Sequence, residues 1–285
     1  AAARFVTRMT GRDVVSWRRV RDRPGGARVY EIALQGGDVV VGAWFADGGK
    51  YAREAAAYEA LRGDESVPAL HGVDAGERVV LVAHLTGVRA SSLPFTSLHW
   101  STVMEDAGGW LARLHRRDVW QVDDVPLGEA YRARVERVES ELEAWEPDVL
   151  TSAIRARLDA LPERLDGRMR VPCHRDFTPD NWLVDPPHLR GVIDFEHARS
   201  DLPEADVARL TNDGWLDAPE RRRAFIRGYE VSDGPAVLEG DVVRDVALLE
   251  AVTTLAWALR HHDVERERLA RRALARSTAM TPGSG

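Results

Sequence analysis

The pattern of strand and helix signals changes near Gly87, and this change limits the folds open to the chain. Before Gly87, short β-rich runs alternate with turn signals, and one Ala- and Glu-rich stretch over 51–61 has helical spacing. After Gly87, amphipathic helical patterns dominate, with short strand-like pieces between residues 170 and 195. The pattern predicts an α+β protein in which a small sheet precedes a larger, mostly helical region.

Length and composition fit a folded chain of two parts, which we divide into domains 1–86 and 87–285. The 285 residues are 44% hydrophobic and 30% charged, unlike a disordered chain. No apolar run approaches the ~20 residues of a membrane helix, and the net charge of −7 disfavours nucleic acid as a partner. Cys173 is the only cysteine, which excludes an internal disulfide. We expect a cytoplasmic protein that is a monomer or weak dimer.

One segment carries a pattern of polar residues that suits phosphoryl transfer from a nucleotide. Asp176 lies two residues after His174, Asn181 follows five residues later, and Asp194 comes after the next apolar run. A carboxylate can orient an attacking hydroxyl and accept its proton. An amide oxygen and a second carboxylate can hold Mg²⁺ against phosphates, because Mg²⁺ accepts few protein oxygens together with phosphates and water. The strand-like flanks predict that Asp194 returns to lie beside Asn181.

Each of these residues also has a purely structural interpretation. Asp176 could cap a turn, Asn181 could form an Asx-turn before Trp182, and His174 could be a core histidine. The joint spacing favours the phosphotransfer interpretation over these separate ones.

This arrangement resembles the aminoglycoside phosphotransferase family, which is related to choline kinases and more distantly to protein kinases. The resemblance rests on His174–Asp176, Asn181 and Ile193–Phe195, and it extends over most of the chain. It implies a bilobal protein-kinase-like fold, with a small antiparallel sheet and one helix in a nucleotide-binding N-lobe, 1–86. The mostly helical C-lobe, 87–285, would carry the catalytic loop, the metal site and the substrate-binding helices.

The resemblance also implies a role for each matching residue. Asp176 would be the catalytic base or the group that orients the hydroxyl, with His174 bracing its loop and Arg175 between them. Asn181 and Asp194 would bind Mg²⁺, with ATP or GTP as the co-substrate. The residues implied at the nucleotide are Gly25 and Gly26 in a loop over the phosphates, Glu54 on the N-lobe helix, and Ala83, His84 and Leu85 at the hinge. We add Lys50 as a candidate at the nucleotide for the reason given below. The family usually has glycine where this chain has Arg175.

The chain departs from the family pattern on its third strand. Members normally carry a lysine there, which pairs with the helix glutamate and holds the α- and β-phosphates. The matching run, 39–45, has no lysine, and we place Gly42 or Trp44 at the lysine's position. The departure leaves open a non-catalytic binding protein of kinase-like fold.

Lys50 is the only lysine among 39 basic residues, so it is the one direct replacement. It could be an exposed residue that pairs with Glu54 four positions later on one helix, or a displaced phosphate ligand. Arg28 or Arg53 could instead supply the charge.

The substrate side favours a small hydroxylated molecule over a peptide. Thr178 stands where protein kinases keep a lysine, and Asp206 follows Asp194 too closely for a long activation segment to lie between them. Nine acids against three arginines over 121–148 form either a solvated helix face or an acidic wall for a cationic ligand. Candidate substrate-binding acids include Glu196, Asp201 and Asp213.

We therefore expect transfer of the γ-phosphate of ATP or GTP to a hydroxyl of a small cationic antibiotic. The acceptor would be an aminoglycoside or a basic peptide or nucleoside antibiotic, and the reaction would give resistance or self-protection. The alternative is a kinase of a small metabolite such as choline, a sugar or an amino acid. Fold analogy does not separate these substrates, since specificity lies in the pocket.

Overall fold

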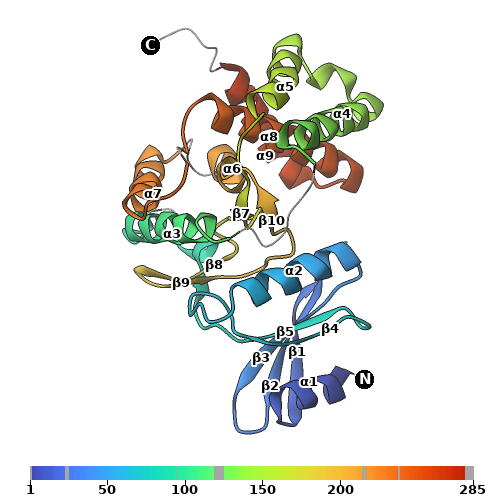
Figure 1. The fold of residues 1–285 in the computed structure, drawn as a ribbon, viewed down its shortest axis with the longest axis vertical. Coiled ribbons are helices and arrows are strands. Elements are labelled where there is room, and N and C mark those ends of the chain that lie inside the picture. The colour runs from blue at the N-terminus through green and yellow to red at the C-terminus, as the bar shows by residue number, and fades with distance from the viewer. Residues whose placement is uncertain are drawn as a thin grey trace. The chain divides into compact units, whose positions relative to one another are not determined.

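The computed structural model describes residues 2–22, 26–94, 96–118, 125–213, 215, 217–236 and 238–279. The chain forms two compact units, which are Ala1–Val103 with His174–Arg199, and Met104–Cys173 with Ser200–Gly285 (Figure 1). The expected α+β class, with an antiparallel N-terminal sheet and a helical C-terminal part, is confirmed. The segment with the phosphotransfer motif groups with the sheet, so the compact units cross the boundary expected after residue 86. That division into nucleotide-binding and substrate-binding lobes stays a prediction.

The first unit is built on a five-stranded antiparallel sheet in the order β1-β2-β3-β5-β4. Its strands are β1 (Val14–Asp22), β2 (Arg28–Leu34), β3 (Val39–Trp44), β4 (Leu70–Asp74) and β5 (Val79–Ala83). A helix that the sequence patterns did not reveal, α1 (Ala2–Thr10), buries Phe5 and Val6 against one face of this sheet. The other helix, α2 (Gly48–Ala60), runs along the opposite side (Figure 1).

The helix α1 fixes which way each residue of β3 points. Val40 and Trp44 pack in the cluster under α1. Because side chains alternate along a strand, Gly42 faces α1 as well, and a Cβ there would lie 2.5 Å from the Trp44 ring. Neither residue faces α2, so our placement of the missing lysine at Gly42 or Trp44 is wrong. The residues of β3 on the α2 side are Val39, Val41 and Ala43.

The start of α2 is set by its N-cap. The Asp47 side chain accepts hydrogen bonds from the backbone N–H groups of Gly49 (2.7 Å) and Lys50 (3.0 Å), as an N-terminal carboxylate does. The helix therefore begins at Gly48, three residues before the start predicted from spacing. This places Lys50 in its first turn.

A three-stranded sheet in the first unit presents the motif. It has the order β6-β8-β9, from β6 (Val88–Arg89), β8 (Trp182–Asp185) and β9 (His188–Val192). The strands β8 and β9 form a hairpin that pairs Trp182 with Val192. This hairpin returns the chain after β9 to the residue that precedes β8, as the sequence predicted.

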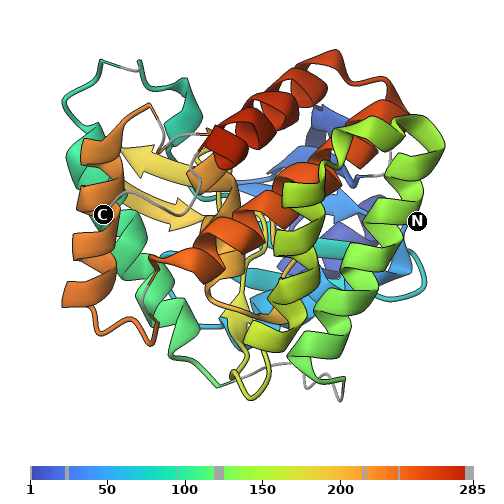
Figure 2. The same ribbon diagram turned by 90° about the horizontal axis from the view of Figure 1, so that it is seen from above.

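The second unit is mostly helical. Its helices are most of α3 (Trp100–His115), then α4 (Leu127–Trp145), α5 (Ser152–Arg164), α6 (Glu204–Asp213), α7 (Pro219–Val231), α8 (Asp241–His261) and α9 (Val264–Ala279). It also contains the short strand β7 (Val171–Cys173) and most of β10 (Arg199–Asp201). Figure 2 shows α4 and α5 side by side, and they share one apolar core with α6, α8 and α9. Among the described residues, no helix combines the length and the apolar character that a membrane crossing requires.

Candidate active site

The segment from His174 to Asn181 forms a loop that is braced by its histidine. His174 is fully buried, and its Nε2 lies 3.0 Å from the carbonyl oxygen of Ile193. The backbone N–H of Asp176 points at His174 Nδ1 over 3.3 Å. Because a carbonyl accepts and an N–H donates, the ring proton belongs on Nε2. His174 thus ties the start of the loop to the strand end just before Asp194.

Asp176 and Asn181 are joined within this loop. The side-chain amide of Asn181 donates to the backbone oxygen of Asp176 (2.9 Å) and to its Oδ2 (3.1 Å). The backbone oxygen of Asn181 accepts from Ile193 N–H at 3.0 Å, so Asp194 follows directly beside Asn181. Asn181 is 3% exposed, whereas Asp176 and Asp194 are half-buried. The structure thus brings the three predicted oxygen-bearing residues together.

Two residues of the site adopt the left-handed backbone conformation. Arg175 has φ of +67° and Asp194 has φ of +72°. A non-glycine residue there costs roughly 1–2 kcal/mol, and such strain concentrates at functional sites. At Arg175 it gives a physical reason for the glycine that is usual in the resembled family.

The helix α2 holds the segment after Asp194 through one face. Lys50 Nζ lies 3.1 Å from Glu196 Oε1, and Arg53 Nε donates to the Glu196 backbone oxygen at 2.9 Å. Glu54 is buried and accepts a hydrogen bond from the backbone N–H of Phe195. The Tyr58 ring packs edge-on against Phe195 with centroids 5.2 Å apart. Lys50 is therefore not the exposed partner of Glu54, because its contact is Glu196.

Two glutamates of the cluster around Asp194, Glu54 and Glu196, have pKa values shifted in opposite directions. Burial raises the pKa of Glu54 well above its ordinary value, and the charges of Asp194 and Glu196 raise it further. Burial would also raise the pKa of Glu196, but hydrogen bonds and charges from His197 and Lys50 outweigh it and lower the pKa to about 2. Glu196 is thus a carboxylate at neutral pH, while burial favours the protonated form of Glu54.

Arg21, at the end of β1, is a member of this cluster that the sequence patterns did not single out. Its guanidinium forms an ion pair with Asp194. Burial would lower the pKa of Arg21, but the charge of Asp194 and the hydrogen bond to it raise the pKa above its ordinary value. In the sequence Arg21 is one of several arginines on a strand with an exposed pattern, and the spacing does not indicate that it belongs to the site.

The predicted adenine-binding residues lie at the end of β5. The N–H of Ala83 donates to Ala69 at 2.8 Å, and that of His84 donates to Val39 at 3.3 Å. These two donors are used within the first unit. Among the described residues, the N–H of Leu85 has no backbone partner, and its role at the adenine stays a prediction. Gly26 is half-buried in a bend, and Gly25 lies outside the described residues.

The donor set fits Mg²⁺. Since Asn181 uses its amide nitrogen on Asp176, its Oδ1 is the side-chain atom left for a cation. With Asp194 this gives two oxygen ligands, which suffice when phosphates and water supply the rest. The presence of a guanidinium at Asp194 shows that this carboxylate attracts positive charge. Asn181 and Asp194 could therefore hold the metal that the motif implies.

The remaining predicted substrate acids lie in the second unit. Asp201 is 3% exposed and accepts hydrogen bonds from the Tyr131 hydroxyl (3.0 Å) and the Leu202 N–H (2.8 Å). These hydrogen bonds hold the buried Asp201 carboxylate within the second unit, which gives it a structural role. Asp213 is exposed at the end of α6. Glu196, in the first unit, already pairs with Lys50.

Part of the acidic stretch 121–148 is paired with arginines where the structure describes it. Residues 121–124 lie outside the described residues. Four of the glutamates of the stretch contact arginines of the second unit, and these are Glu139, Glu141, Glu143 and Glu146. This favours the solvated, paired helix face over an acidic wall for a cationic ligand.

A second buried polar cluster lies within the second unit. His115 Nε2 is 3.0 Å from Asp206 Oδ2, and His115 Nδ1 is 2.9 Å from the Tyr229 hydroxyl. The Cys173 thiol donates to the backbone oxygen of Leu202 at 3.3 Å. Each of these buried groups has a protein partner, so the cluster has the character of a structural brace.

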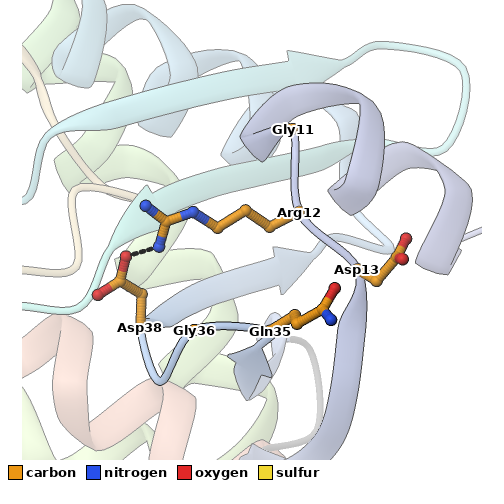
Figure 3. Close-up of a pocket in the computed structure, with 6 residues that line it drawn as sticks. All are labelled: Gly11, Arg12, Asp13, Gln35, Gly36 and Asp38. Carbon is orange, nitrogen blue, oxygen red and sulfur yellow. Dashed lines mark hydrogen bonds and ion pairs between the residues drawn. The ribbon is translucent and has the colours of Figure 1, made fainter.

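A polar hollow of about 480 Å³ lies elsewhere in the first unit. Figure 3 shows its lining, with Arg12 and Asp38 paired across it. It is formed where β1 begins and where β2 turns into β3. The predicted phosphate loop follows the other end of β1, so this hollow is separate from the motif residues.

The fold and the cluster of Asp176, Asn181 and Asp194 define a kinase-like phosphotransferase. Comparison with known proteins specifies the family. Residues 27–240 match the model of the phosphotransferase enzyme family. The chain belongs to this family, which confirms the expectation of a small-molecule phosphotransferase.

Solved structures similar to this chain share its whole fold at low identity. The thermostable mutant (D198A) of aminoglycoside phosphotransferase APH(4)-Ia, in a ternary complex with ADP and hygromycin B, has a TM-score of 0.74 and 18% identity, with 99% of both chains covered. Macrolide 2'-phosphotransferase MphH from Brachybacterium faecium has a TM-score of 0.67 and 16% identity, with 99% of this chain and 98% of that chain covered.

Curated relatives match a shorter region. Homoserine kinase from Pseudomonas aeruginosa PAO1 is 39% identical over 80 residues, 26% of this chain and 25% of that protein. Homoserine kinase from Acidiphilium cryptum is 34% identical over 88 residues, 28% of this chain and 27% of that protein. The chain spans about a quarter of the length of these relatives.

Proposed function

We propose that this protein transfers the γ-phosphate of ATP or GTP to a hydroxyl group of a small molecule that also carries an amine. The observation that carries the proposal is the joint placement of Asp176, Asn181 and Asp194. Asn181 is bonded to Asp176 through its side chain and to Ile193 through its backbone, so one loop positions all three.

In this proposal Asp176 orients the acceptor hydroxyl and accepts its proton. The bond between the acceptor oxygen and the γ-phosphorus forms as the bond from that phosphorus to the β,γ-bridging oxygen breaks, and the nucleoside diphosphate leaves. His174 keeps the loop in place through Ile193, so the carboxylate does not have to be ordered at the moment of reaction.

Asn181 and Asp194 would hold Mg²⁺, which neutralises phosphate charge when it is bound. The role of α2 is positional. Lys50 contacts the Glu196 carboxylate, Arg53 donates to the Glu196 backbone oxygen, and Glu54 accepts from the Phe195 N–H. These three contacts fix the segment that follows Asp194, the predicted metal ligand.

The acceptor class rests on what similar proteins bind or are named for. Solved neighbours are complexes with hygromycin B and with gentamicin, and the curated relatives are homoserine kinases. These compounds share a hydroxyl and at least one amine. We place basic antibiotics first, since the neighbours span the whole chain. A hydroxylated amino acid is the second candidate, supported by the partial homoserine kinase matches.

The test is a coupled assay of ADP or GDP release with Mg²⁺, over aminoglycosides, macrolides, basic peptide and nucleoside antibiotics, choline and homoserine. We expect acceptor-dependent release with one of these classes. The variant D176N should lower kcat about 10²- to 10⁴-fold, the usual contribution of a general base, while nucleotide affinity stays within about twofold. The control D180N changes an exposed aspartate of the same loop and should keep full turnover.

The outcomes separate the candidates. Turnover of an antibiotic class supports the first acceptor, and turnover of homoserine supports the second. Full activity in D176N would contradict the assignment of Asp176 and with it the proposed mechanism.

A further inference from the structure

The strand β3 has no lysine or arginine, although the resembled family normally has a lysine on this strand. On the α2 side of β3 the residues are Val39, Val41 and Ala43, and none carries charge. The phosphates of a nucleotide need a cation at this face, so another element has to supply it.

A β-bulge in β1 turns Arg21 to that same face. Arg19 pairs with Tyr30, but Arg21 pairs with Val29, so Val20 is an extra residue and the register shifts. Tyr30 packs against the α1 cluster, and cross-strand partners share a face. Without the bulge, Arg21 would point to the α1 side with Arg19. Bulges commonly re-aim a side chain in this way.

The register also places Arg21 in the row where the charge is missing. Val29 of β2 pairs with Arg21 on one side and with Ala43 of β3 on the other. Arg21 and Ala43 therefore stand on one face, two strand spacings or about 10 Å apart. A side chain as long as that of arginine can therefore reach from β1 to the α2 side of Ala43.

The guanidinium of Arg21 can donate to a further hydrogen-bond acceptor. Its side chain is 21% exposed and pairs with Asp194, while Glu196 and Asp176 add to the negative potential around it. Its Nε is buried and has no hydrogen-bond partner among the described residues. A buried N–H donor without a partner is costly, and a phosphate oxygen would satisfy it.

The other cations considered for this role are placed elsewhere. Lys50 and Arg53 contact Glu196. Arg28 is exposed and pairs across the sheet with Trp44, so it faces α1. Of these four candidates, only Arg21 both points to the α2 face and contacts the predicted metal carboxylate.

We propose that Arg21 replaces the missing strand lysine and binds the α- and β-phosphates of the nucleotide. The inference rests on the proposed function. A guanidinium offers a planar pair of donors that matches two phosphate oxygens. Asp194 is also a predicted Mg²⁺ ligand, so Arg21 and a bound metal would both contact this carboxylate. A bound phosphate would give the guanidinium a second acceptor.

The experiment is calorimetric binding of ADP, GDP and the matching nucleosides to the full chain, with and without Mg²⁺. R21M should weaken binding of the preferred diphosphate about 10- to 100-fold, the effect of losing a hydrogen bond to a charged group, and leave nucleoside binding unchanged. R19M, on the same strand but the opposite face, should bind like the wild type. The double variant R21M/A43K restores a cation in the same row and should recover part of the lost affinity.

The results distinguish this inference from the function on which it rests. A wild type that binds neither diphosphate overturns both. Tight binding by the wild type with equal affinity in R21M overturns the role of Arg21 alone. A loss of nucleoside binding equal to the loss of diphosphate binding, with no recovery in R21M/A43K, also overturns it, because the variant would then act through the sheet.

Discussion

Replacing Glu196 by glutamine should destabilise the protein in a way that depends on pH. Glu196 has a side chain that is 6% exposed, lies 3.1 Å from Lys50 Nζ and lies 3.4 Å from His197 Nε2. Burial opposes its charge, but the contacts with His197 and Lys50 lower its pKa from 4.5 to about 2. E196Q removes the charge and keeps the shape, while the bond from Arg53 to the backbone oxygen stays.

The size of the effect follows from the shift. A difference of about 2.5 pKa units, at about 1.4 kcal/mol per unit, makes the ionised Glu196 worth about 3 kcal/mol of folding free energy at pH 7. Because the folded-state pKa is below the unfolded one, this stability is present above pH 4.5 and is lost as the pH falls toward 2. At pH 3.5 most unfolded chains hold the proton, so about 1.4 kcal/mol is already gone.

Urea unfolding of the wild type and E196Q at pH 7 and pH 3.5 measures both quantities. The free energies of unfolding should differ by about 3 kcal/mol at pH 7 and by about 2 kcal/mol at pH 3.5. The control E65Q, at an exposed glutamate of the same unit, should differ little from the wild type at either pH. A gap between wild type and E196Q that stays constant or widens on acidification would refute the reasoning.

Three further changes test the packing and the backbone. R175G should raise the free energy of unfolding by about 1 kcal/mol in urea, because the φ of +67° favours glycine, and a less stable variant would contradict this. G108A should lower the melting temperature, at a cost of about 1–3 kcal/mol, since its Cβ would lie 2.0 Å from the Phe225 backbone oxygen. In G109A the nearest atom to the new Cβ is the Ser232 hydroxyl at 3.0 Å, and the nearest backbone atom is the Gly228 oxygen at 3.5 Å. G109A should therefore be neutral or slightly stabilising, and equal effects of the two variants would disprove the close approach of α3 and α7. Y229F should lose about 1 kcal/mol in thermal unfolding with the bond to His115, and an unchanged stability would remove the buried cluster's bracing role.

The motif was readable from the sequence because its geometry is local. The apolar runs on either side of a short turn predict the β8–β9 hairpin, and a hairpin places its two ends together. Asn181 and Asp194 stand at those ends, and the Ile193–Asn181 backbone bond of 3.0 Å joins them. The histidine brace lies two residues from Asp176, so it also required no long-range information.

The faces of the N-terminal sheet could not be read in this way. Alternation along β3 separates Val40 and Gly42 from Val41 and Ala43, but it does not say which set faces the nucleotide side. That depends on which face α1 covers, and α1 was not recognised. The error at Gly42 therefore follows from the missed helix. Arg21 was missed for a related reason, since one inserted residue in β1 reverses the face of every side chain after it.

The contacts of the acidic residues show why counting charges does not identify the residues that bind the substrate. With 39 basic residues, nearly all arginine, an acid in this chain commonly has a cation in reach. Glu139 and Glu146 pair with arginines, and Glu196 pairs with the single lysine. At Asp176, Oδ2 accepts a hydrogen bond of 3.1 Å from the neutral side-chain amide of Asn181, and the charge of Arg21 also acts on this carboxylate. The neutral amide orients the carboxylate without adding a positive charge to it, which suits a group that accepts a proton from a hydroxyl.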